Sequence, residues 1–137
     1  MNYSLTNRLY KSEKLCGVTR IDGLFATGQS LIAYPLRAVF DVAGAEPQVA
    51  PARFLVSVPK KKLRRAVDRV LIRRRVREAY RLNRALLLPA LAAHGRRVDV
   101  AFVYLSSSLK DYGIIEEKMR QLLNRIAAQA SEQDGNS

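Results

Sequence analysis

Residues 60–84 read KKKLRRAVDRVLIRRRVREAYRLNR, and they are the stretch of this 137-residue chain that decides its fold. The stretch holds twelve of the chain's 24 lysines and arginines. Only Asp68 and Glu78 oppose these cations, so the stretch carries +10 of the formal net charge of +12. Charge gathered on one element produces a local positive field that can hold a polyanion.

The same stretch has the periodicity of an amphipathic helix. At about 100° per residue, one arc of roughly 120° is mostly apolar. This arc contains Ile72, Val76, Ala79, Tyr80, Asn83, Leu86 and Leu87. The adjoining arc contains Arg73, Arg74, Arg77, Arg81 and Arg84, with Arg69 at its border. We therefore predict one helix from about Arg65 to Leu88, packed on a sheet by its apolar side, with Pro89 interrupting it.

Two strands and a short helix are predicted before the basic stretch. Thr19 can cap a helix that runs to about Thr27 and is stopped by Gly28. Residues 31–42 are typical of a strand in which one face carries Ile32, Tyr34, Leu36, Ala38 and Phe40. Pro35 within it favours an edge position or a bulge. Residues 43–51 are predicted to form a loop, and residues 52–58 a second strand.

The elements predicted after the basic helix complete the fold. Residues 90–94 can add a helical turn closed by Gly95, residues 97–105 form a mostly apolar strand, and residues 111–130 form an amphipathic helix. The order α-β-β-α-β-α, with an optional extra small strand, defines an α+β fold built as an α/β sandwich.

Length and composition favour a single domain. We expect a flexible amino-terminal arm over residues 1–15, one folded domain over residues 16–130, and a disordered tail over residues 131–137. The lone cysteine, Cys16, cannot form an internal disulfide and suits a reducing compartment, so the cytoplasm is the expected location. No apolar run is long enough for a membrane span or a signal peptide.

The charge pattern restricts the possible functions. A basic face can be no more than a solvated surface, but like charges at i,i+3 and i,i+4 destabilise a free helix, so a bound polyanion explains the pattern better. A membrane surface would require a broad exposed apolar face, and here that face is needed for the sheet. The only histidine, His94, is expected to cap a helix, and the carboxylates form no cluster. Any catalysis is therefore expected to belong to a partner, and no catalytic residue or metal site is assigned to this chain.

Val70 breaks the cationic arc, because it lies three and four residues before Arg73 and Arg74. An exposed valine in this place can be incidental, or it can contact an apolar part of the partner. Both interpretations stay open at this point.

The basic stretch resembles the signature of the bacterial ribonuclease P protein subunit, a lysine-rich loop followed by A-V-x-R-N-R-I-K-R-x-x-R-E-x-(F/Y)-R on a helix. The matching residues are Ala66, Val67, Arg69, Ile72, Arg73 (where lysine is usual), Arg74, Arg77, Glu78, Tyr80 and Arg81. The context is also similar, with F-x-x-G at Phe25 to Gly28 and S-V-P at Ser57 to Pro59. The likeness covers about residues 15–125, and it departs from the family pattern at Val70 and Leu71, where the family has Asn and Arg.

This resemblance implies a fold, partners and a function. The basic helix would lie in a left-handed βαβ crossover beside a small mixed sheet. The protein would be the non-catalytic subunit of a ribonucleoprotein endonuclease that removes the 5′ leader of precursor tRNA, with the catalytic RNA as its partner. The RNA would carry out the chemistry with Mg²⁺, and the leader would lie in a cleft between the first helix and the sheet. The chain itself is expected to bind no cofactor, to avoid membranes, and to be a monomer in the absence of RNA.

Site residues follow from the pattern and the resemblance together. The predicted contacts to the catalytic RNA are Lys60, Lys61, Lys62, Arg65, Arg69, Arg73, Arg74, Arg77 and Arg81. Guanidinium groups suit this role because they bind phosphate in a bidentate manner. The predicted leader contacts are Phe25, Tyr34 and Phe40, although the three aromatic rings can equally be ordinary core residues. The alternative function is a general structural RNA-binding protein, such as a ribosomal component.

Overall fold

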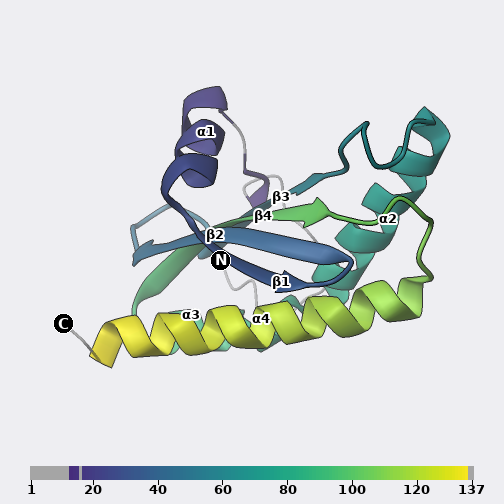
Figure 1. Ribbon diagram of the computed structural model, residues 1–137. Coiled ribbons are helices and arrows are strands. Elements are labelled where there is room, and N and C mark those ends of the chain that lie inside the picture. Colours follow the sequence, from purple (N-terminus) through teal and green to yellow (C-terminus); the bar gives the residue numbers. More distant parts are fainter. Residues whose placement is uncertain (1–12, 16, 136–137) are drawn as a thin grey trace.

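The computed structural model describes residues 13–15 and 17–135, and it shows a four-stranded sheet with helices on both faces (Figure 1). The elements in chain order are α1 (Val18–Thr27), β1 (Gln29–Ala33), β2 (Leu36–Gly44), β3 (Ala52–Ser57), α2 (Ala66–Asn83), the 3-10 turn η3 (Arg84–Leu86), α3 (Leu88–Ala93), β4 (Arg96–Tyr104) and α4 (Tyr112–Gly135). In Figure 1 the helix α1 stands above the sheet, and α4 runs below it.

The sheet is mixed, with strand order β1-β2-β4-β3. The pairs β1–β2 and β2–β4 are antiparallel, whereas β3 and β4 are parallel neighbours. Because β3 and β4 are joined through α2, the basic helix lies in the crossover of a βαβ unit. The predicted α+β class with a small mixed sheet is confirmed. The left-handed sense of the crossover stays a prediction.

The single strand predicted over residues 31–42 is wrong, because the chain turns back at Tyr34 and Pro35. Ala33 pairs with Leu36, so Tyr34 and Pro35 form the whole turn of a hairpin, and the Tyr34–Pro35 peptide bond is cis. Pro35 therefore lies in a turn and not at an edge or a bulge. The extra small strand is β1.

The turn also changes which side chains share a face. Ile32 pairs with Arg37, so both lie on the opposite face from Leu36 and Phe40. The face with Leu36 and Phe40 is buried under α2 and α4.

The main core lies between the sheet and the helices α2, α3 and α4. Helix α2 buries Ile72, Val76, Ala79 and Tyr80, as its periodicity predicts. The Tyr80 ring is stacked on Phe54 of β3 at a centroid distance of 4.3 Å and lies 5.6 Å from Phe102 of β4. Aromatic contacts of this kind stabilise by about 0.5–1.5 kcal/mol beyond area burial. They fix α2 against the parallel pair of strands.

A smaller core lies on the other face, under α1. Leu24 of α1 packs with Val39 of β2, Ala101 of β4 and Leu15. Gly28 ends α1 in a crowded place, where a Cβ would lie 2.5 Å from the Leu24 carbonyl oxygen in the last turn of α1 and 3.1 Å from the Phe40 carbonyl oxygen of β2. This approach explains a glycine at the end of the F-x-x-G segment.

Several predicted boundaries differ from the structure. Helix α1 begins at Val18 after Gly17, whose φ of 100° suits glycine, so Thr19 is not its cap. The basic helix ends at Asn83, and Pro89 lies at the start of α3, where its missing N–H costs nothing. Helix α4 extends to Gly135, which includes most of the predicted tail.

The packed domain begins earlier than predicted. Glu13 and Leu15 are buried, and the Leu15 amide donates to the Phe54 carbonyl oxygen at 2.8 Å. The rest of the predicted arm, residues 1–12, and Cys16 lie outside the described residues. Among the helices that the structure describes, none combines the length and the apolar character needed to cross a bilayer.

Candidate nucleic-acid interface

The loop that carries the three lysines is held in place at the start of α2. The Pro59 carbonyl oxygen accepts hydrogen bonds from the amides of Lys62 and Leu63, at 3.0 and 3.3 Å. Leu63 is buried in the main core. Nη1 of Arg69 donates to the carbonyl oxygens of Leu63 and Arg64, at 2.9 and 2.8 Å. The loop is thus tied to the core and to α2, while the lysines stay exposed.

Exposed cations continue from this loop along one side of α2. The side chains of Arg73, Arg74 and Arg77 are exposed and fall within the arc predicted from helical spacing. Together with the loop they form a continuous set, which we call the cationic surface. Its members are Lys60, Lys61, Lys62, Arg64, Arg65, Arg73, Arg74 and Arg77. Within the part of the chain that the structure describes, no carboxylate forms an ion pair with any of them.

Four other arginines of the basic stretch have internal partners. Besides Arg69, Arg81 lies 2.5 Å from the Glu78 carboxylate, and Arg75 donates to the Lys110 carbonyl oxygen at 2.6 Å. The placement of Arg84 on the cationic arc is wrong. Its side chain is buried and forms an ion pair with Glu13, because the segment before α1 lies against η3.

The predicted leader residues lie in three different environments. Phe40 is 0% exposed in the main core, so its prediction as a leader contact is wrong. The reason is the hairpin turn, which places Phe40 on the face under α2 and α4. Phe25 of α1 is 43% exposed, and Tyr34 at the hairpin tip is 54% exposed. The Lys110 ammonium lies 5.9 Å from the centroid of the Tyr34 ring.

The sheet face beside α1 carries three neighbouring residues that the sequence alone does not indicate as a site, one of them exposed and two half-buried. Ile32 of β1, Arg37 of β2 and Val103 of β4 lie side by side through the strand register. Nε of Arg37 donates to the Ser30 hydroxyl at 2.8 Å. The sequence signal for this face is the hairpin turn at Tyr34 and Pro35, because the position of the turn decides which side chains of β1 and β2 lie on the face beside α1.

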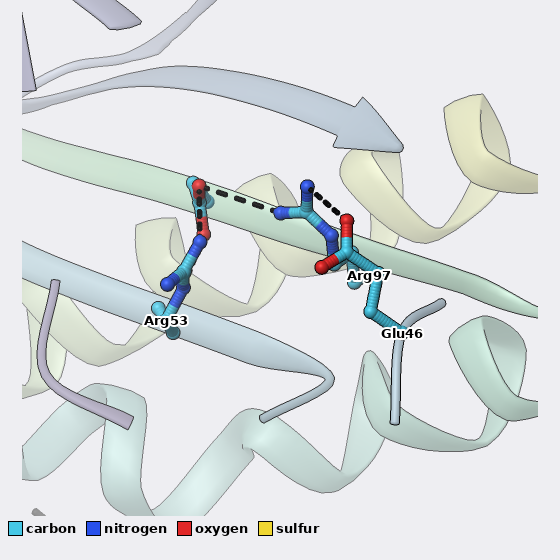
Figure 2. A network of polar contacts seen from close by, with 4 residues as sticks. Glu46, Arg53 and Arg97 are labelled. Carbon is cyan, nitrogen blue, oxygen red and sulfur yellow. Dashed lines mark hydrogen bonds and ion pairs between the residues drawn. The ribbon is translucent and has the colours of Figure 1, made fainter. Parts of the chain in front are cut away.

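The far end of the same sheet face is occupied by a network of ion pairs (Figure 2). Arg53 of β3 donates to both carboxylate oxygens of Asp99 on β4, at 2.8 and 2.9 Å. Arg97 lies 3.7 Å from Asp99 and 3.3 Å from Glu46. These two arginines have their charges compensated, so the network contributes to the sheet and not to the cationic surface.

Two tyrosines have raised pKa values, and neither lies on the cationic surface. Burial raises the pKa of Tyr80 well above its usual range, as expected for a core hydroxyl. Burial, and then the neighbouring Glu116 carboxylate, raise the pKa of Tyr112 to about 12. The described residues include no group of three or more His, Cys, Asp or Glu side chains that could hold a metal ion. The cationic surface itself consists of lysine and arginine side chains alone.

Taken together, the fold and this surface define a class: a small α+β protein with a ridge of exposed arginine and lysine, which is the electrostatic signature of a nucleic-acid-binding protein. The profile of the family Ribonuclease P matches residues 9–127. A ribonuclease P protein component of Porphyromonas gingivalis is 43% identical over 119 residues, covering 87% of this chain and 86% of the relative. That of Chlorobaculum tepidum is 36% identical over 105 residues, covering 72% and 68%.

Solved structures show the same fold. The ribonuclease P protein from Thermotoga maritima superposes with a TM-score of 0.65 at 22% identity, covering 82% of this chain and 96% of that one. The Staphylococcus aureus ribonuclease P protein gives a TM-score of 0.63 at 16% identity, with coverage of 85% and 96%. The chain belongs to the bacterial ribonuclease P protein family. Its function is that of the protein subunit of the ribonucleoprotein endoribonuclease that matures the 5′ end of tRNA.

Proposed function

We propose that the cationic surface is the contact to the catalytic RNA of ribonuclease P. The observation that carries this proposal is the set of eight exposed lysines and arginines without a carboxylate partner among the described residues. Arg69 ties the lysine loop to α2, so the loop and helix cations are held together before the RNA arrives. Preorganised guanidinium groups lose less conformational entropy on binding phosphate than free side chains do.

Arg69 and Arg81 belong to this interface in smaller roles. Arg69 has one guanidinium nitrogen engaged by loop carbonyl oxygens, and Arg81 shares its charge with Glu78. Arg69 can still turn its remaining donors toward a phosphate. Replacement of Arg69 or Arg81 should therefore lower the affinity for RNA by less than replacement of Arg73 or Arg77 does.

The 5′ leader of precursor tRNA would lie on the open sheet face beside α1. Phe25 offers an exposed ring on one side of this face, and Tyr34 offers another at the hairpin tip. Between them, Arg37 can bind a leader phosphate while Ile32 and Val103 supply an apolar floor. Stacking of an unpaired base on an aromatic ring contributes about 1–3 kcal/mol.

Mg²⁺ belongs to the RNA partner in this proposal. Of the two carboxylates that α2 carries, Glu78 already binds Arg81, and Asp68 lies in the first turn, where it stabilises the helix. The protein then contributes by lowering the repulsion between phosphates, a role that overlaps with that of the metal ion. Addition of the protein should therefore matter most when Mg²⁺ is scarce.

A reconstituted processing assay tests the RNA contact. The catalytic RNA is incubated with precursor tRNA at low Mg²⁺, with the protein or with its variants. We expect wild-type protein to accelerate leader removal. Arg73→Ala with Arg77→Ala should weaken RNA affinity at least about a hundredfold, since two charged contacts together contribute at least about 3 kcal/mol. Arg120→Ala is the matched control, because Arg120 is also exposed but lies on α4. Equal effects of the double variant and the control would contradict the proposal.

The leader contact needs a separate comparison. The RNA–protein complex is titrated with precursor tRNA and with mature tRNA, which lacks the leader. Phe25→Ala should reduce the preference for precursor and leave the affinity for mature tRNA unchanged. An equal loss with both ligands would show that Phe25 acts elsewhere.

A further inference from the structure

Two valines interrupt the cationic surface with exposed apolar side chains. Val67 is 61% exposed and Val70 is 42% exposed, although both lie on α2, whose other side is packed in the core. Neither belongs to either hydrophobic cluster. Folding therefore leaves these two side chains in water.

The valines lie among the arginines and not beside them. At about 100° per residue, Val70 is within roughly 60° of Arg73, Arg74 and Arg77 around the helix axis. Val67 is one turn earlier, close to the loop that carries the lysines. Any molecule that neutralises these arginines must cover Val70 as well.

The surroundings restrict what can cover them. A partner must be strongly anionic to match the cationic surface, and it must bring an apolar group to a place only two valines wide. A membrane or a protein would require a broader apolar face. An unpaired nucleotide has both properties, since its base or ribose is flanked by two phosphates, and unstacked bases are common in the loops and bulges of folded RNA.

We propose that Val67 and Val70 pack against the base or ribose of an unpaired nucleotide in the bound RNA. Arg73 and Arg77 hold the neighbouring phosphates. This inference rests on the proposed RNA contact and adds a selective element to it. The arginines bind any RNA backbone, whereas the valines favour a point at which a nucleotide leaves the stack.

Replacement of the valines should change the salt dependence of RNA binding differently from replacement of the arginines. Removal of a phosphate contact lowers the slope of log K against log salt by about 0.7–0.9. An apolar contact displaces water and no counterion, so its loss should weaken binding by the same factor at every salt concentration. Truncation of one partly exposed valine should cost roughly three- to tenfold in affinity.

The experiment measures the affinity of the full chain for ribonuclease P RNA over a salt series. The variants are Val67→Ala, Val70→Ala and Val70→Thr, the last of which keeps the shape and adds a hydroxyl. Leu82→Ala is the matched control, since Leu82 is 40% exposed on the same helix but about 120° away from Val70 around the axis. Alanine has a higher helix propensity than valine, so a loss of affinity in Val67→Ala or Val70→Ala cannot come from a weaker helix.

The expected result is a three- to tenfold loss for each valine variant, with an unchanged salt slope and no loss for Leu82→Ala. Wild-type affinity in the valine variants, or a reduced slope, would overturn the inference and leave the phosphate contacts intact. A change in the monomer–dimer equilibrium of the free Val70→Ala chain would assign the valines to a second copy instead. A flat slope for the wild-type chain would overturn the underlying RNA contact as well.

Discussion

Replacement of Arg84 by methionine should destabilise the domain by about 3–5 kcal/mol, because it breaks a buried ion pair and removes the arginine that compensates the charge of Glu13. Both side chains of this ion pair are almost inaccessible, with relative exposures of 2% and 1%. The pair joins residues 71 positions apart and fastens the segment before α1 to the end of the basic stretch. For a domain of this size, the loss corresponds to a fall in melting temperature of roughly 10–20 °C.

Urea unfolding followed by far-ultraviolet circular dichroism measures this change, and the midpoint should fall without a change in the slope m. Glu13→Leu combined with Arg84→Met should recover most of the loss, since the buried charge is then removed together with its partner. Arg77→Met is the control, because Arg77 lies exposed on α2, and its cost should stay within about 0.5 kcal/mol. A cost below about 1 kcal/mol for Arg84→Met would refute the reasoning that the pair stabilises the fold.

Three further predictions concern stability and titration. Gly28→Ala should lower the free energy of unfolding by about 1–3 kcal/mol, because its Cβ would lie 2.5 Å from a backbone oxygen. Gly23→Ala in the open interior of α1 should raise it by about 0.5–1 kcal/mol. Thermal unfolding of both variants tests the contrast. Asp99→Asn should cost about 1.5–3 kcal/mol through its lost charged bonds to Arg53, and a neutral result in urea unfolding would show that the network contributes nothing. Tyr112 holds its proton in the folded state up to a pKa of about 12, so its stabilising contribution is complete below pH 10 and is lost as the pH rises toward 12. Tyr112→Phe should remove this pH dependence of unfolding and one late step from the 295-nm absorbance titration.

The basic helix could be predicted from the sequence because its signal is local. Ile72, Val76 and Ala79 recur at helical spacing, and the same spacing places Arg73 and Arg77 on the outer side. No distant residue is needed to decide this division. The strand predicted over residues 97–105 is likewise recognisable locally, because its apolar run predicts a central strand, and β4 lies between β2 and β3 in the sheet.

The errors arose where a partner distant in sequence decides the outcome. Arg84 has the helical phase of an exposed arginine, but it is buried and paired with Glu13, which the chain before α1 brings to it. The alternation of a single strand predicts that Phe40 shares a face with Tyr34, but the turn at Pro35 breaks that alternation. A two-residue turn inside an apolar run is not recognisable from period alone, since both halves of the hairpin look like one strand.

The most direct test of the central claim is the salt dependence of binding between this chain and ribonuclease P RNA. With about six phosphate contacts, a plot of log K against log salt should have a slope of about −4 to −5. Arg73→Ala together with Arg77→Ala should make the slope shallower by about 1.4–1.8, while the melting temperature stays unchanged. A nearly flat slope for the wild type, or a slope that the double variant leaves unaltered, would contradict the claim that these exposed arginines hold the RNA.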